Sequence, residues 1–306
     1  MAEKKPLATF AIFFYNQRDY VSQAVNAALA QDYENLEILF SDDCSPDGTF
    51  EEIQECVKGY EGPHKIILNK NEKNLGIAGH VNKVLYELCS GDYIVLGAGD
   101  DVSMPIRVSR SVNFFEANPE IQSLSFESLQ VDKDLNTIEG RNIQLSNGLT
   151  SILTLDDYCS FKDFLIFSGD SRALRKNVVD KFPPFSDAKE EDLELFVRSL
   201  ILGPIAYIRE PLVKRRIDGN NVSKRAIPLA KREAQNRQLK KDVLFGYEQK
   251  YIRSEQKDAL LKKADELMRI LVNVDNSRRH PLLYKVFRGI SKGADHLGYS
   301  ICKSLK

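Results

Sequence analysis

The sequence predicts an α/β protein built on a mostly parallel, Rossmann-like sheet flanked by helices, and three observations lead to that class. Short runs rich in Val, Ile, Leu and Phe are continuous rather than alternating, which is typical of strands buried on both faces. Segments of about 10–15 residues with apolar side chains at helical spacing separate these runs, and such an alternation forms βαβ units. The chain of 306 residues is 42% hydrophobic and 28% charged, which suits a soluble protein with a sizeable core.

The N-terminal part of the chain, residues 1–103, alternates regularly between the two kinds of segment. The expected strands are residues 8–15, 36–40, 65–68 and 92–96, and the expected helices are residues 19–30, 50–60 and 77–89. Right-handed crossovers place the loops that follow parallel strands on one edge of the sheet. The polar segments 42–47 and 69–76 and the pair Asp100-Asp101 are therefore expected to converge at the edge where open α/β sheets bind ligands.

Residues 104–223 are expected to continue this domain with less regular elements. The pattern predicts a helix at about 105–117, a strand at 121–131, a loop or hairpin insertion at 132–150, a helix opened by the acidic cluster 187–192, and two short strands at 205–208 and 212–217. Acids in a first helical turn also suit the helix macrodipole, so capping accounts for part of that cluster.

The remaining residues, 224–306, are expected to form a basic, helical C-terminal extension. An apolar stripe over residues 229–272 predicts one or two long helices, and two arrangements are open for them: packing on the body, or pairing with a second copy of the chain. Residues 224–306 carry a net charge of +11 and the residues before them −12. The basic amphipathic segment 278–306 is typical of binding to an anionic membrane surface, and a packed C-terminal helix is the alternative.

Composition excludes several other classes of protein. No apolar run is long enough to span a membrane, and the N-terminus has no secretory signal. Five scattered cysteines and four scattered histidines argue against a disulfide framework, structural zinc or a histidine-rich metal site. The expected location is the cytoplasm, at the inner face of the plasma membrane if the basic segment binds there, and no nucleic-acid partner is expected.

Known ligand loops are absent from the polar turns. The turn from Asp43 to Gly48 resembles half of a calcium-binding loop, but Gln54 stands where that loop needs Glu, and a strand rather than a helix precedes it. Neither GxGxxG nor GxxxxGK[ST] occurs, which disfavours classical dinucleotide and P-loop sites. Two adjacent acids at a strand end, such as Asp100 and Asp101, are costly unless a cation or hydrogen-bond donors meet them, although a solvated acidic turn is the simpler alternative.

Several segments in order resemble family 2 glycosyltransferases, which are inverting, nucleotide-sugar-dependent enzymes of the GT-A fold. The resemblance spans about residues 8–223. The segments are Phe14-Tyr-Asn16, Ala30-Gln-Asp-Tyr33, Glu37-Ile-Leu-Phe-Ser-Asp-Asp-Cys-Ser-Pro-Asp-Gly-Thr49, Asn74-Leu-Gly76, Gly91-Asp-Tyr-Ile94, Asp100-Asp-Val-Ser-Met-Pro105, Glu191-Asp192 with Arg198, Glu210-Pro-Leu-Val213, and Arg216 to Ser223.

The resemblance implies roles for particular residues. Asp43, with Asp42, is expected near the nucleotide base and ribose. The other residues expected to bind the donor are Tyr15, Asn16, Lys73, Asn74, Gly76 and Asp100. Asp101, Asp100 and Asp218 stand where the family holds Mn²⁺ or Mg²⁺, and Asp192, next to Glu191, stands where it keeps its catalytic base.

Three departures from the family pattern bear on the metal and the diphosphate. Gly97-Ala98-Gly99 replaces a lead-in that often carries a further Asp, Lys73 replaces a frequent Arg, and Asp218 replaces a common His. The metal site therefore has fewer ligands than usual, and Asp101 is expected to be its main one.

The function implied is transfer of a sugar from a nucleotide-sugar, expected to be UDP-linked, to a hydroxyl of a glycan or lipid-linked acceptor in surface polysaccharide synthesis. The metal stabilises the diphosphate leaving group, and one base deprotonates the acceptor, unlike the two carboxyls of glycoside hydrolases. Two alternatives remain. One is a nucleotidylyltransferase, which the absence of a glycine-rich basic loop after residue 10 disfavours, and the other is a non-catalytic nucleotide-binding scaffold subunit.

Overall fold

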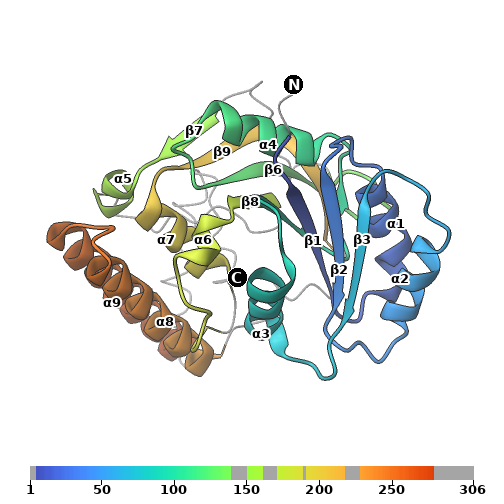
Figure 1. Ribbon diagram of the computed structural model, residues 1–306. Coiled ribbons are helices and arrows are strands. Elements are labelled where there is room, and N and C mark those ends of the chain that lie inside the picture. The colour runs from blue at the N-terminus through green and yellow to red at the C-terminus, as the bar shows by residue number, and fades with distance from the viewer. Residues whose placement is uncertain (1–4, 139–149, 161–170, 189–190, 218–227, 279–306) are drawn as a thin grey trace.

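The computed structural model describes residues 5–138, 150–160, 171–188, 191–217 and 228–278. Within these residues one sheet of nine strands runs in the order β3-β2-β1-β4-β8-β6-β9-β5, with β7 paired to β9. Figure 1 shows this twisted sheet with helices on both of its sides. The α/β class predicted from the sequence is confirmed.

The N-terminal part alternates between strands and helices as predicted. Its strands are β1 (Ala8–Phe14), β2 (Leu36–Asp42), β3 (Lys65–Lys70) and β4 (Tyr93–Ala98), and its helices are α1 (Arg18–Leu29), α2 (Thr49–Val57) and α3 (Gly76–Lys83), the last continued by the π-helix η1 (Val84–Leu88). The strand β1 pairs in parallel with β2 and β4, and β2 pairs in parallel with β3. Their carboxyl ends therefore share one edge of the sheet, which we call the carboxyl edge.

The middle of the chain completes the sheet with mixed strand directions. Its elements are β5 (Val102–Ser103), α4 (Arg107–Ala117), β6 (Ser123–Val131), β7 (Thr150–Leu153), α5 (Leu155–Ser160), β8 (Arg172–Arg175), α6 (Asn177–Asp180), α7 (Asp192–Leu202) and β9 (Ile205–Arg216). The strand β8 is antiparallel to both β4 and β6, whereas β6 and β9 are parallel. Most of the insertion expected at 132–150 lies outside the described residues.

The two short strands expected at 205–208 and 212–217 form one strand, so this prediction is wrong. Proline has no N–H for the strand ladder, so Pro211 would ordinarily interrupt a strand. In the structure β9 runs through it, and the register against β6 shifts on either side of Glu127, which faces Pro211. Such an irregularity accommodates extra residues and the proline without ending the strand.

Apolar side chains fill both faces of the sheet. On one face, β1 and β4 pack with α1, α2 and α4 around Phe10, Val25 and Phe115. On the other face, the same strands pack with α3, α6 and the start of α7 around Leu96, Val81 and Leu195. Figure 1 shows α1 and α2 on one side of β1–β3 and α3 on the other. The sheet is therefore fixed from both sides, and its carboxyl edge carries the polar loops.

The C-terminal residues described form two helices that pack on the body. α8 (Leu229–Glu248) and α9 (Ser254–Arg278) share an apolar cluster with α5 and α7, in which Leu239, Val243 and Leu260 meet Phe196. Of the two arrangements open for residues 229–272, the structure shows packing on the body. The segment 279–306 lies outside the described residues, so membrane binding there stays a prediction, as does a domain boundary at residue 223. Within the described part of the chain, no helix combines the length and apolarity that spanning a bilayer requires.

Glu194 is a buried acid at the α7–α8 contact. Its side chain is 0% exposed, and no close, well-aligned hydrogen bond reaches either carboxylate oxygen from the described residues. Burial raises the pKa of Glu194 well above its ordinary value of 4.5; its own backbone N–H and the Gln235 side chain oppose the rise, and the charge of nearby Asp242 adds to it. A carboxyl group whose pKa is higher in the folded state than in the unfolded chain destabilises the fold. The loss of stability grows as the pH rises above the pKa of the unfolded chain.

Replacing Glu194 with Met is expected to stabilise the protein. We expect the free energy of unfolding at about pH 8 to rise by about 1–3 kcal/mol, which is the usual cost of burying an unpartnered polar group. The gain should be smaller at about pH 5, because Glu194 is then partly protonated in the unfolded chain and its protonation on folding costs less free energy. Urea unfolding at both pH values measures this, with Glu248→Met on the exposed side of α8 as the control. A loss of stability, or a gain independent of pH, would contradict the account.

Candidate active site

The loops after β1 and β2 are joined through Ser45, which the carboxylate of Asp42 holds. This side chain is fully buried, and its oxygens accept hydrogen bonds from the backbone N–H and the hydroxyl of Ser45, at 2.9 and 2.5 Å. The Ser45 hydroxyl oxygen in turn accepts the backbone N–H of Asn16 at 2.9 Å. Asn16 has a φ of +55°, a conformation that Asn tolerates better than most residues. Asp42 therefore shapes the turn that presents Asn16 and Tyr15.

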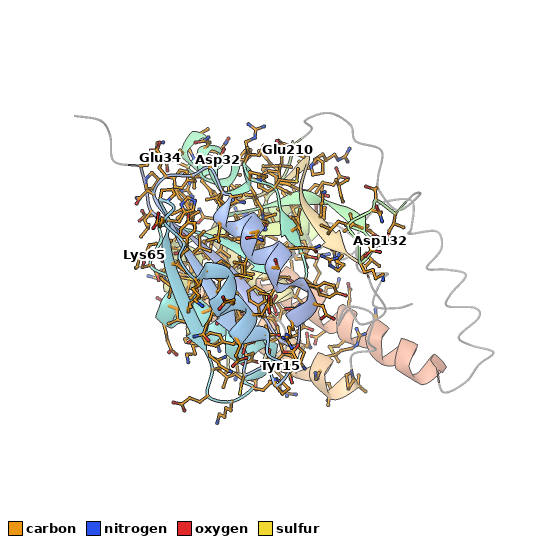
Figure 2. All side chains as sticks on the ribbon, turned by 90° about the vertical axis from the view of Figure 1, so that its right-hand side faces the viewer. Tyr15, Asp32, Glu34, Lys65, Asp132 and Glu210 are labelled. Atoms are coloured by element: carbon orange, nitrogen blue, oxygen red, sulfur yellow. The ribbon has the colours of Figure 1, made fainter. Side chains whose placement is uncertain are left out.

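Tyr15 is 46% exposed at the end of β1. Figure 2 places it at the opposite end of the molecule from Asp32 and Glu34, which precede β2. The ring is thus an uncovered aromatic surface at the carboxyl edge, next to the turns that follow β1 and β2. An exposed aromatic ring at a ligand-binding edge offers a stacking surface for a nucleotide base.

Asp43 holds the loop that follows β3. Its carboxylate accepts three N–H groups: Asn71 Nδ2 at 2.7 Å, the Leu75 backbone at 2.9 Å and the Gly76 backbone at 3.0 Å. Gly76 has a φ of +71°, which glycine adopts without strain. Asp43 is 3% exposed, while Lys73, Asn74 and Gly76 are exposed beside it. The predicted convergence of the 42–47 turn with the 69–76 loop is therefore present.

A buried histidine on α3, His80, is hydrogen-bonded to the end of β2, next to Asp43. His80 Nε2 lies 2.7 Å from the hydroxyl oxygen of Ser41, and that hydroxyl accepts Asn69 Nδ2 at 2.9 Å. Burial lowers the pKa of His80 to about 4, although the charge of Asp43 opposes the shift. The imidazole is therefore neutral at pH 7, and its Nε2 shares a hydrogen bond with the Ser41 hydroxyl. This role of His80 was not predicted from the sequence.

Asp100 and Asp101 form a tight turn after β4 that Arg216 holds in place. One carboxylate oxygen of Asp101 accepts the backbone N–H of Arg216 at 2.9 Å, and Arg216 Nε donates to the backbone oxygen of Asp100 at 2.9 Å. The guanidinium also donates to Gln23 and to the backbone oxygen of Lys133. Arg216 is 1% exposed and Asp101 8% exposed. The end of β9 therefore fixes the acidic turn.

Close packing requires the small residues in front of this turn. A Cβ atom on Gly99 would lie 2.2 Å from Cδ1 of Phe14, and one on Gly97 would lie 2.9 Å from the ring of Phe10. Side chains at these positions would displace the aromatic core of β1. This gives a physical reason for the Gly97-Ala98-Gly99 lead-in.

Asp192 begins α7 with an exposed carboxylate. Its side chain is 51% exposed, while the nine residues that follow it in the helix are buried. Arg172, at the start of β8 and 1% exposed, donates from Nη1 to the backbone oxygen of Asp192 at 2.9 Å and lies 3.9 Å from its Oδ1. Glu191 precedes it as the cap of α7 and is half-buried. No role for Arg172 was predicted from the sequence.

The third predicted metal ligand, Asp218, lies outside the described residues. Within the described residues, no three His, Cys, Asp or Glu side chains gather as they do in a metal site made by protein alone. Asp100 and Asp101 can supply one or two carboxylates. A divalent cation bound through them would need further oxygen ligands, such as the phosphates of a substrate.

A family comparison decides which kind of protein this site belongs to. The model of "Glycosyl transferase family 2" matches residues 9–182, more than half of the chain. The chain belongs to glycosyl transferase family 2. The protein is therefore a transferase enzyme, and the resemblance drawn from its sequence is confirmed.

Relatives of this glycosyltransferase match it over different lengths. An uncharacterized glycosyltransferase of Haemophilus influenzae is 28% identical over 72% of this chain and 68% of its own. The Escherichia coli enzyme WfaP, named as a UDP-Glc:α-D-GlcNAc-diphosphoundecaprenol β-1,3-glucosyltransferase, is 31% identical over 42% of this chain and 48% of its own. This chain therefore spans less than half of the length of WfaP.

Solved structures confirm the fold of this glycosyltransferase. Staphylococcus aureus TarS 1–349 in complex with UDP-GlcNAc matches with a TM-score of 0.62 at 15% identity, covering 84% of this chain and 71% of that one. The mannosyltransferase PcManGT from Pyrobaculum calidifontis, in complex with GDP-Man and Mn²⁺, matches with a TM-score of 0.57 at 14% identity, covering 98% and 78%. The family 2 domain therefore has the GT-A fold, followed by C-terminal helices.

Proposed function

We propose that this glycosyltransferase transfers a sugar, with inversion, from a UDP-sugar to a hydroxyl of a glycan or lipid-linked acceptor during synthesis of a surface polysaccharide. The observation that carries the proposal is the placement of three acids at the ends of three different elements. Asp43 follows β2, Asp101 follows β4, and Asp192 begins α7, each held by named partners. The role of UDP and of a polysaccharide precursor is supported by the names of WfaP and TarS.

The donor nucleotide is proposed to bind between the loops after β1, β2 and β3. The resemblance to the family implies that Asp43, with Asp42, lies near the base and ribose, and the exposed residues Tyr15, Asn16 and Asn74 lie at the same edge. Lys73, also exposed, adds a positive charge for the diphosphate. Because Asp43 already holds Asn71 and the backbone at Leu75 and Gly76, the 71–76 loop is preorganised for the donor.

A divalent cation fits the acidic turn on chemical grounds. Mn²⁺ and Mg²⁺ prefer oxygen ligands and are commonly bound through one or two carboxylates together with substrate phosphates. We propose that Asp101 is the main ligand, with Asp100 and Asp218 beside it. When bound, the cation supplies charge stabilisation for the departing diphosphate. Arg216 keeps the turn in one place, so the ligand is preorganised.

Asp192 is proposed to act as the general base. Its exposed carboxylate can take the proton of the acceptor hydroxyl as that oxygen forms a bond to the anomeric carbon and the bond to the diphosphate breaks. The proton ends on Asp192 and the electron pair of the broken bond on the diphosphate. One base and one displacement invert the anomeric centre, and we assign neighbouring Glu191 to the same catalytic site.

The proposal is tested by incubating the enzyme with UDP-glucose or UDP-N-acetylglucosamine and Mn²⁺. We expect UDP release, slow with water as acceptor, that stops when the metal is chelated. Donors that stay intact under all conditions would contradict a catalytic role.

A further inference from the structure

The segment that leads to Asp192 is held from the nucleotide-binding side by one side-chain carboxamide. Asn82 Oδ1 accepts the backbone N–H of Phe185 at 2.9 Å, and Asn82 Nδ2 donates to the Phe185 backbone oxygen at 2.8 Å. Asn82 lies on α3, and the first residue of that helix, Gly76, donates to Asp43. One short helix thus connects the proposed donor loop to the segment before α7.

A second carboxamide holds the same segment from the C-terminal side. Gln238 of α8 is 2% exposed, and its Oε1 accepts the backbone N–H groups of Ser186 at 2.7 Å and Asp187 at 2.9 Å. Three consecutive backbone positions, 185 to 187, are therefore bonded to buried or half-buried side chains of two different helices. This arrangement fixes the path of the main chain five residues before Asp192.

A buried ion pair fixes Gln238 itself. Gln238 Nε2 donates to Asp242 Oδ1 at 2.9 Å, and the same carboxylate binds Arg198 of α7 through two hydrogen bonds at 2.7 and 2.8 Å. The side chains of Arg198 and Asp242 are 0% and 2% exposed. The Arg198 guanidinium also lies 4.2 Å from the ring centre of Phe185. α7, α8 and the 185–187 segment therefore interlock around one charge pair.

Such a pair contributes more to geometry than to net stability. Removing two charges from water costs nearly as much as their attraction returns, so a buried ion pair is weak evidence for stability. The pair joins α7, which begins with Asp192, to α8, whose Gln238 holds residues 186 and 187. The pair thus sets one relative placement of α7 and α8.

We propose that Gln238 and Asn82 are positioning residues that place the start of α7, and with it Asp192, for proton transfer. The inference rests on the proposed role of Asp192 as the base. A base must come within about 2.6–3.2 Å of the proton it removes, and a displacement of about 1 Å can cost on the order of 100-fold in rate. Since the carboxylate of Asp192 is half-exposed, its placement depends on Arg172 and on the position of α7, which the Arg198–Asp242 pair ties to α8.

The test compares two variants on the same face of α8. Gln238→Met removes both backbone hydrogen bonds, and we expect kcat for UDP release from UDP-glucose or UDP-N-acetylglucosamine with Mn²⁺ to fall about 10- to 100-fold. The KM for the donor and the affinity for UDP should stay within about twofold of the wild type, since no donor contact is touched. Lys241→Met is the matched control. Lys241 contacts the side chains of Ser186 and Asp187 but not their backbone, so kcat should be unchanged.

A second variant covers the case in which Gln238→Met does not fold. Asn82→Ala removes the other carboxamide from a half-buried position and should lower kcat in the same way, again without a change in donor KM. A misplaced base should also alter the pH profile of kcat, which a purely structural defect at a temperature well below unfolding would not do.

Wild-type kcat in either folded variant, or a loss of UDP affinity as large as the loss of kcat, would overturn the positioning role. An Asp192→Asn enzyme that is inactive beside a fully active Gln238→Met enzyme would reject only the positioning role, whereas full activity of Asp192→Asn would reject the base itself.

Discussion

Asp192→Asn is expected to lower the rate of sugar transfer about 100- to 10,000-fold while leaving the affinity for UDP unchanged. Asn has the same shape as Asp but cannot accept the acceptor proton near neutral pH. The structural anchor of this position should survive, because Arg172 donates to the backbone oxygen of residue 192. The two measurements are kcat for UDP release or transfer, and calorimetric titration of UDP.

The matched control for this variant is Asp180→Asn. Asp180 is also an exposed acid next to a basic side chain, Lys176 at 3.0 Å, but it lies on α6. Its loss should leave turnover within about twofold of the wild type, as is usual for surface substitutions. An Asp192→Asn enzyme with the turnover of the wild type would refute the role of Asp192 as the base.

Asp101→Asn is expected to abolish the part of UDP binding that depends on Mn²⁺. The Asn oxygen can still accept the backbone N–H of Arg216, so the turn keeps its shape, but the charge that attracts the cation is lost. We expect the UDP affinity measured with Mn²⁺ to fall about 10- to 100-fold, which corresponds to about 1.4–2.8 kcal/mol. Without metal the variant and the wild type should bind UDP equally.

Asp92→Asn is the control for this experiment. Asp92 lies just before the other end of β4, and its carboxylate also accepts a backbone N–H, that of Leu7 at 3.0 Å. It is far from the carboxyl edge, so its variant should show the full effect of Mn²⁺. Metal-enhanced binding of normal size in Asp101→Asn would contradict the assignment of Asp101 as the main metal ligand.

The regular part of the fold was predictable because its signals are local. Continuous apolar runs marked β1 to β4, and helical spacing marked α1 to α3, so their order and the shared carboxyl edge followed. The two-residue strand β5 has no periodicity, and β9 continues through Pro211 only because β6 shifts register opposite it. These features depend on pairing between distant segments, which the local pattern does not contain.

The candidate site was predictable to the same extent. Asp43 and Asp101 could be proposed as site residues because each follows a strand, and the position of a strand end follows from the apolar run before it. The residues that hold these acids were not identified, because their contacts join positions far apart in the sequence, as Arg216 joins Asp101. The carboxamide of Gln238 gave no signal, since a polar residue on a charged helix is ordinarily exposed.

The anomeric configuration of the first product tests the central claim most directly. The enzyme is incubated with an α-linked UDP-sugar and Mn²⁺, and the released or transferred sugar is followed by proton NMR before mutarotation. The account predicts that the β-anomer forms first, since one base and one displacement invert the anomeric carbon. The α-anomer as the first product would contradict the account.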